Sequence, residues 1–232
     1  MPTPVRFSKY FFLLILSVIL AGCDIAESCP PVKMSASSTE YLQFVKQILA
    51  SDENCSPPCW QGLMPGESTY ADVLNTLTEI PFVDQKSFNK SVPSQNETGL
   101  INWSNTAPQS LSISGQATFA GDAILKAIHF TASYEHPLES LGTVIDTFGE
   151  PNVYFVGSSH DFSCKWNRII WLDEGLEIQT FTQRAEEDGP HLSGNTAVRS
   201  VVYFIPQETL EEYLRNGYGI SESNYRKWNG FP

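Results

Sequence analysis

The amino-acid sequence predicts an α+β fold of two tandem modules, each a helix followed by a four-stranded antiparallel sheet. Two segments, near residues 70–77 and 138–148, carry apolar residues at helical spacing. Four short runs rich in β-branched and aromatic residues follow each of them. Val73 and Val144 open matching stretches 71 residues apart, which favours an internal repeat. The alternative is a chance likeness between two ordinary α+β stretches.

The N-terminus predicts export and a lipid anchor. Residues 1–22 have the features of a secretory signal peptide, with Arg6 and Lys9 ahead of an uncharged apolar run. Leu20-Ala21-Gly22-Cys23 resembles the lipobox of bacterial lipoproteins. That resemblance implies that Cys23 is the first mature residue and carries a diacylglycerol thioether, with an acyl chain such as palmitate on its amino group. The alternative is an ordinary secretory signal with an incidental cysteine.

Charge and hydropathy narrow the possible locations and partners. No later segment has the roughly 20 apolar residues that cross a bilayer. We therefore expect a bacterial cell-membrane lipoprotein in the cell envelope, held only by its lipid and facing the extracytoplasmic side. Asp24 resembles the signal for retention at the inner membrane of diderm bacteria, but inner and outer membrane both stay open. The net charge of -12 argues against nucleic-acid binding.

Export also places four further cysteines in an oxidising compartment. Cys55 and Cys59 are held close by two intervening prolines, so we predict a disulfide between them. If they do not pair locally, Cys29 could reach either one, or Cys164. A four-thiolate zinc site would need a second short-spaced cysteine pair, and we therefore expect no metal.

The mature chain divides into five predicted parts. They are a lipidated tether (23–37), an N-terminal helix and Cys-Pro loop (38–59), a first module (60–133), a second module (134–206), and a C-terminal helix with an aromatic tail (207–232).

Capping and breaking residues define the predicted elements in order. A capping box at 37–40 begins the first helix, and a second helix runs from about residue 69 to Pro81. A third begins at Pro137 and stops at Gly149. Hairpin turns are expected at 120–122 and 173–175. The predicted strands are 82–88, 100–104, 111–119, 124–132, 153–156, 166–172, 176–182 and 198–205.

Two short patterns resemble known families. Gly149-Glu150-Pro151 after the 144–148 stretch, and Gly66-x-Ser68 before Val73, resemble the helix signature of the SmpA/OmlA outer-membrane assembly lipoproteins and of β-lactamase-inhibitor-protein modules. That resemblance implies a small α+β sandwich whose sheet faces a protein partner. Residues 55–66 resemble the Cys-x-x-x-Cys-Trp-x-Gly-x-x-Pro-Gly segment of uncharacterised bacterial lipoproteins, which implies no particular activity.

The sequence contains no motif that predicts catalysis or a cofactor. The four histidines, at 129, 136, 160 and 191, lack a metal-binding spacing. Ser159-His160-Asp161 contains triad residue types, but adjacent residues cannot converge on one point. The acidic run at 186–188 lacks the alternating oxygen ligands of a calcium loop. We therefore predict a protein that is not an enzyme.

Aromatic residues favour binding. Five tryptophans lie in the mature part, and four aromatic residues lie between Tyr218 and Phe231, in a tail that we expect to dock back on the sheet. We predict an envelope lipoprotein with a non-enzymatic protein-binding or assembly role and a protein partner of unknown identity. The alternative is a binding protein for a small molecule or a glycan, with tryptophan faces as stacking surfaces.

Overall fold

The computed structural model describes residues 45–49, 55–94, 97–105, 113–133, 136–158, 164–183, 192–219 and 224–231. Cys23, Cys29, the predicted signal peptide (1–22) and the predicted tether (23–37) lie outside the described residues. No helix among the described residues is long and apolar enough to span a membrane.

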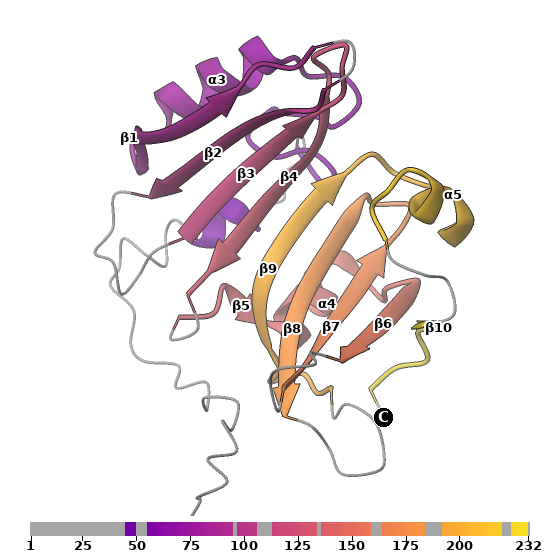
Figure 1. The fold of residues 1–232 in the computed structure, drawn as a ribbon. Coiled ribbons are helices and arrows are strands. Elements are labelled where there is room, and N and C mark those ends of the chain that lie inside the picture. The colour runs from indigo at the N-terminus through magenta and orange to yellow at the C-terminus, as the bar shows by residue number, and fades with distance from the viewer. Residues whose placement is uncertain are drawn as a thin grey trace, which may run out of the picture.

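A single antiparallel sheet of ten strands dominates the fold (Figure 1). The order of the strands is β1-β2-β3-β4-β9-β8-β7-β6-β10, and the short β5 pairs with β9 off this path. The strands are β1 (Val83–Ser91), β2 (Gly99–Asn105), β3 (Ile113–Phe119), β4 (Leu125–Ala132), β5 (Glu139–Ser140), β6 (Val153–Ser158), β7 (Cys164–Trp171), β8 (Leu176–Gln183), β9 (Ala197–Phe204) and β10 (Tyr225–Lys227).

The prediction of an α+β fold with two tandem modules is wrong. The fold is mainly β, and the strands of both halves belong to one sheet. Separate modules would leave β4 and β9 as sheet edges with unpaired backbone groups. Instead, five residue pairs from Ala127↔Phe204 to Thr131↔Ser200 join these strands. The individual strands were located to within a few residues by their apolar runs, but their assembly was not.

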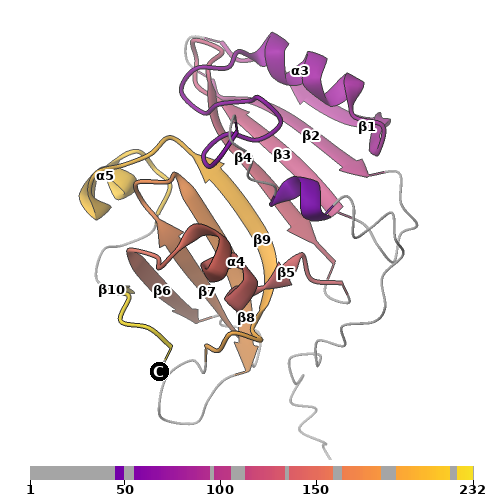
Figure 2. The same cartoon turned by 180° about the vertical axis from the view of Figure 1, so that it is seen from behind.

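Short helices cover one face of this sheet (Figure 2). They are α3 (Tyr70–Glu79), α4 (Leu141–Phe148) and a helical turn at 45–48. Their buried apolar residues, including Val45, Val73 and Val144, join the same core cluster as the inward-facing residues of β2, β3, β4, β7, β8 and β9. We call this side the covered face.

Side-chain caps fix where the helices begin. Thr69 and Asp72 form a reciprocal capping box at the start of α3, in agreement with the predicted start. The predicted start of α4 at Pro137 is wrong, because Ser140 is the N-cap and its hydroxyl accepts a hydrogen bond from Thr143 N–H. The two residues before α4, Glu139 and Ser140, form strand β5 because they pair with β9. Gly149 ends α4 as predicted, with φ of 79°.

Aromatic residues from the N-terminal half fill the centre of the core. Trp60, Trp103 and Phe130 contact one another, with ring centroids 4.7–6.4 Å apart. Gly115 lies opposite Trp103 on the neighbouring strand, where a Cβ atom would overlap the indole ring. The indole therefore occupies the space above a residue that has no side chain.

The predicted Cys55–Cys59 disulfide is confirmed. The two sulfur atoms are 2.11 Å apart, and the Cα atoms are 5.0 Å apart. The bond closes the loop that leads into Trp60, whose indole N–H donates to Gln47 O at 3.2 Å. The disulfide thereby lies next to the helical turn at 45–48 and the aromatic core.

The C-terminal segment docks back onto the sheet, as expected for its aromatic residues. Helix α5 (Leu210–Arg215) places Tyr213 against Phe204 on the face opposite α3 and α4, with ring centroids 5.2 Å apart. Strand β10 then pairs with β6 and forms one edge of the sheet. Trp228 is 7% exposed, whereas Phe231 is 42% exposed.

Candidate functional site

Strand alternation gives the N-terminal half of the sheet a second, uncovered side. Residues of β2, β3 and β4 that alternate with the buried core positions are all partly or fully exposed. We call eight of these residues the open face: Leu100, Asn102, Ser104, Ser114, Gln116, Thr118, His129 and Thr131. The ninth, Ala127, packs against the cluster that contains Tyr213. None of them carries a formal charge, although the chain has 26 acidic and 14 basic residues.

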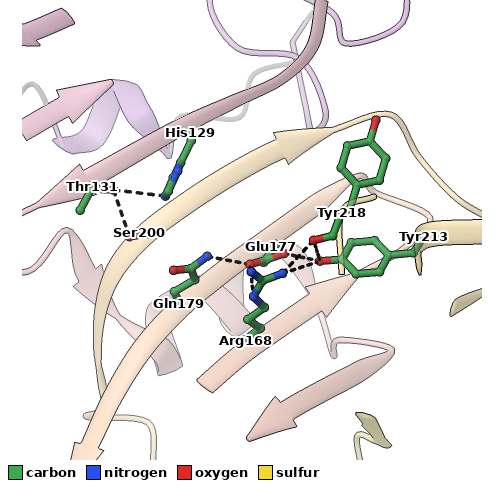
Figure 3. A network of polar contacts seen from close by, with 8 residues as sticks. All are labelled: His129, Thr131, Arg168, Glu177, Gln179, Ser200, Tyr213 and Tyr218. Atoms are coloured by element: carbon green, nitrogen blue, oxygen red, sulfur yellow. Dashed lines mark hydrogen bonds and ion pairs between the residues drawn. The ribbon is translucent and has the colours of Figure 1, made fainter. Parts of the chain in front are cut away.

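Hydrogen-bonding side chains lie in register across the open face. Asn102, Gln116 and His129 are consecutive cross-strand partners, and Gln116 Nε2 donates to Asn102 Oδ1 at 2.8 Å. The Thr131 hydroxyl lies 3.1 Å from His129 Nε2 and 3.3 Å from Ser200 Oγ on β9 (Figure 3). These contacts continue the row of polar side chains from β2 to Ser200, which is buried on β9.

His129 is held neutral by its surroundings. Burial lowers the pKa of its imidazole, because the charged form loses solvation, and the Arg168 guanidinium lowers it further. The imidazole therefore adds a hydrogen-bonding group to the open face without adding a charge near neutral pH.

A buried ion pair lies on the same side of the sheet, over β7 and β8. The Glu177 carboxylate accepts hydrogen bonds from Tyr213 Oη, in a short contact, and from Gln179 Nε2 at 2.9 Å. Arg168 Nε lies 3.3 Å from Glu177 Oε1. We call these four residues the Glu177 network (Figure 3). Burial raises the pKa of Glu177, while Arg168 and the two hydrogen-bond donors oppose that increase.

The Glu177 network fixes the C-terminal segment in place. Arg168 Nη1 donates to the Tyr218 carbonyl at 2.7 Å, and its guanidinium lies 5.1 Å from the centroid of the Trp166 ring. Burial by itself would lower the pKa of Arg168, but Glu177 and neighbouring tyrosines raise it, so the guanidinium remains charged. The network thus ties α5 and Tyr218 to the sheet, where they reach as far as Ala127 on β4 and leave β2 and β3 uncovered.

The sequence-based candidates for chemistry do not converge on the open face. His129 is part of it, while Ser159-His160-Asp161, His191 and the acidic run at 186–188 lie outside the described residues. Cys164 begins β7. Within the part of the chain that the structure describes, no three His, Cys, Asp or Glu side chains are grouped as metal ligands.

Sequence reasoning missed the Glu177 network, although part of it has a local signal. Arg168 and Glu177 are charged residues within two largely apolar runs on either side of the predicted turn at 173–175. In the β7–β8 hairpin Arg168 pairs with Gln179. Glu177 lies two residues before Gln179 on the same face, so Arg168 and Glu177 are diagonal neighbours. Tyr213 has no such signal, because it reaches Glu177 from a separate element 36 residues later.

Comparison of the chain with protein-family models, with curated proteins and with solved structures found no match.

Proposed function

We propose that this chain is a membrane-anchored envelope lipoprotein that binds another protein through the open face of its sheet and catalyses no reaction. The observation that carries the proposal is the uncharged, hydrogen-bonding character of the open face in a chain of net charge -12. The partner that fits is a protein whose docking surface is also uncharged.

The energetics of desolvation favour such a surface for docking. Moving a charged group out of water is costly unless a partner charge replaces the solvent, and the cores of protein interfaces are accordingly depleted in charged residues. Ser, Thr, Asn and Gln can exchange hydrogen bonds with water for hydrogen bonds with a partner. The open face therefore loses little when a neutral surface covers it.

The size of the surface corresponds to a transient complex. Strands lie about 4.8 Å apart and rise about 3.3 Å per residue, so four strands of about seven residues present roughly 440 Å² of planar area. A partner that covers β1 to β4 would bury about 900 Å² in total over both molecules, because β9 is buried on both of its faces and adds no accessible area. That area is typical of weak and transient protein complexes.

The tryptophan rings are poorly exposed for stacking on a glycan. Trp60, Trp103, Trp171 and Trp228 are each at most 7% exposed, which removes them as stacking surfaces. The ring of Trp166 is half-buried and has Arg168 over it. We therefore place the protein partner ahead of the glycan.

The anchor part of the proposal rests on Cys23 and its lipobox. Cys23→Ser should release the protein from membranes and change its electrophoretic mobility. Retention on the membrane with unchanged mobility would remove Cys23 as the anchor and leave the docking proposal standing.

Site-specific crosslinking in native membranes tests the docking surface. A photoreactive amino acid at Ser114, which is exposed on β3, should give a discrete adduct with one protein. The same group at Asn75, exposed on α3, is the control and should not form that adduct. Gln116→Lys places a charge within the open face and should abolish the adduct, whereas Asn75→Lys should leave it unchanged.

Two results would contradict the proposal. Equal adducts from positions 114 and 75 would show that capture does not depend on the open face. Failure to crosslink any protein, together with binding of a neutral glycan that Gln116→Lys abolishes, would assign the open face to a glycan. Circular dichroism of each variant distinguishes loss of the surface from loss of the fold.

A further inference from the structure

A wide, open cavity of about 740 Å³ lies at one end of the sheet. Its lining comes from residues just before β2, the turn between β3 and β4, the start of β4, Ile205 just after β9, and the end of α5 with the segment that follows it. The volume lies within the roughly 300–1,000 Å³ of small-molecule sites. The cavity is therefore large enough for a ligand of a few residues.

Charged groups are distributed unevenly around this cavity. Glu97 lies just before β2, and Asp122 lies in the β3–β4 turn, whereas Lys126 is on β4 and Arg215 ends α5 beyond β9. Along the strand order β2-β3-β4-β9, Glu97 and Asp122 come before Lys126 and Arg215, and Asp122 and Lys126 belong to the same hairpin. Among the described residues, no ion pair engages Glu97, Asp122 or Lys126.

Local contacts position Lys126 at this cavity. Its ammonium lies 5.2 Å from the centroid of the Tyr218 ring, and the Tyr218 hydroxyl donates to the Lys126 carbonyl at 3.2 Å. A side chain that is already restricted loses less conformational entropy when it binds a ligand.

The acidic side of the cavity is also shaped by its turn. Asp122 Oδ1 accepts the backbone N–H of Ile124 at 3.2 Å, which orients the carboxylate. The intervening Ala123 has φ of 66°, in the left-handed region that non-glycine residues rarely occupy.

Arg215, on the opposite side, forms a 3.7 Å ion pair with Glu212 in which both side chains are exposed. Such a pair is weak and does not prevent Arg215 from contacting a ligand.

We propose that this cavity binds a zwitterionic ligand of the class of amino acids and short peptides with free ends. The ligand carboxylate lies toward Lys126 and Arg215, and its ammonium group lies toward Glu97 and Asp122. A simple anion would be repelled by the two carboxylates, and a simple cation would be repelled by the two basic side chains. A ligand that carries both charges is therefore complementary to the cavity. The inference does not depend on the proposed docking role of the open face.

Calorimetric titration of the full mature chain in detergent tests this proposal. The probes are alanine and alanine oligomers of two to four residues with free ends. We expect the best of them to bind, and its N-acetylated and C-amidated forms to bind at least tenfold more weakly. Lys126→Met, which keeps the aliphatic stem over Tyr218, should weaken the free peptide about tenfold and remove the preference for a free carboxylate. Glu97→Gln should remove the preference for a free ammonium.

Lys227→Ala is the matched control, because this exposed lysine lies on β10 at the far edge of the sheet. It should bind the probes as the unmodified chain does. The proposal is overturned if none of the four probes binds at millimolar concentration. It is also overturned if blocked and free peptides bind equally, or if Lys126→Met and Lys227→Ala have the same effect.

Discussion

Replacing Arg168 with methionine would leave Glu177 as a buried carboxylate without its ion-pair partner. The side chain of Glu177 is 4% exposed and that of Arg168 is 17% exposed. Tyr213 and Gln179 would still donate to the carboxylate, but neither carries a compensating charge. Removing one partner of a buried ion pair typically costs about 3–5 kcal/mol, so we expect Arg168→Met to lower the free energy of unfolding by that amount near neutral pH.

The reciprocal change should cost less. Glu177→Gln leaves Arg168, which is more exposed, still donates to the Tyr218 carbonyl and still lies over Trp166. We expect this variant to lose about 1–3 kcal/mol. The double variant leaves no lone buried charge and should therefore recover about 2 kcal/mol relative to Arg168→Met alone.

The pH dependence gives a second test of the same reasoning. Burial raises the pKa of Glu177, and loss of the guanidinium raises it further. An acid with a raised pKa in the folded state binds more protons when folded, so its contribution to stability increases as the pH falls. The cost of Arg168→Met should thus be smaller at about pH 5 than at about pH 7.5.

Urea unfolding, followed by tryptophan fluorescence, measures the free energy of unfolding of the unmodified chain, the two single variants and the double variant. A cost for Arg168→Met below about 1 kcal/mol, or one that is the same at both pH values, would refute a buried, ionised Glu177. An unchanged m value is the control for comparable unfolding of the variants.

Three further predictions concern the core, a helix cap and a partly buried tyrosine hydroxyl. Gly115→Ala places a methyl group into the Trp103 indole and should cost about 1–3 kcal/mol, measured by urea unfolding, with a changed near-ultraviolet circular dichroism spectrum. Ser140→Ala removes the N-cap of α4 and should cost about 1 kcal/mol, whereas Ser140→Asp should retain most of the stability; equal losses would contradict the capping role. Burial raises the pKa of Tyr218 to about 12. The contribution of this hydroxyl to stability is therefore complete below about pH 10 and is lost as the pH rises through 12. An ultraviolet titration of the Tyr218→Phe variant should lack the ionisation step near pH 12 that the unmodified chain shows.

Local sequence patterns predicted the elements better than their assembly. Alternation located the strands because β2, β3 and β4 bury one side and expose the other. The pairing of β4 with β9 joins segments about 70 residues apart and leaves no local signal, so the single sheet was missed. The start of α4 was misplaced for the same reason, since pairing with β9 takes Glu139 and Ser140 into a strand.

The candidate site shows the same limit. The Cys55–Cys59 disulfide was predictable because both partners lie within five residues. The residues of the open face could be placed side by side only after the register of the paired strands was known. Gln116 and His129, for example, become neighbours only when β3 and β4 pair as they do. The Tyr213–Glu177 contact and the end cavity depend on how the C-terminal segment docks, which no periodicity in the sequence records.

The seam between β4 and β9 has a consequence for folding after the proposed export. Strand β4 ends at Ala132, and its neighbour in the sheet is completed only at Phe204. A chain that crosses a membrane from its N-terminus delivers β1 to β4 before β9. Until β9 follows, the N-terminal strands have a bare hydrogen-bonding edge that another chain could occupy. A holding factor in the envelope that keeps this edge apart until β9 arrives should therefore raise the yield of folded protein.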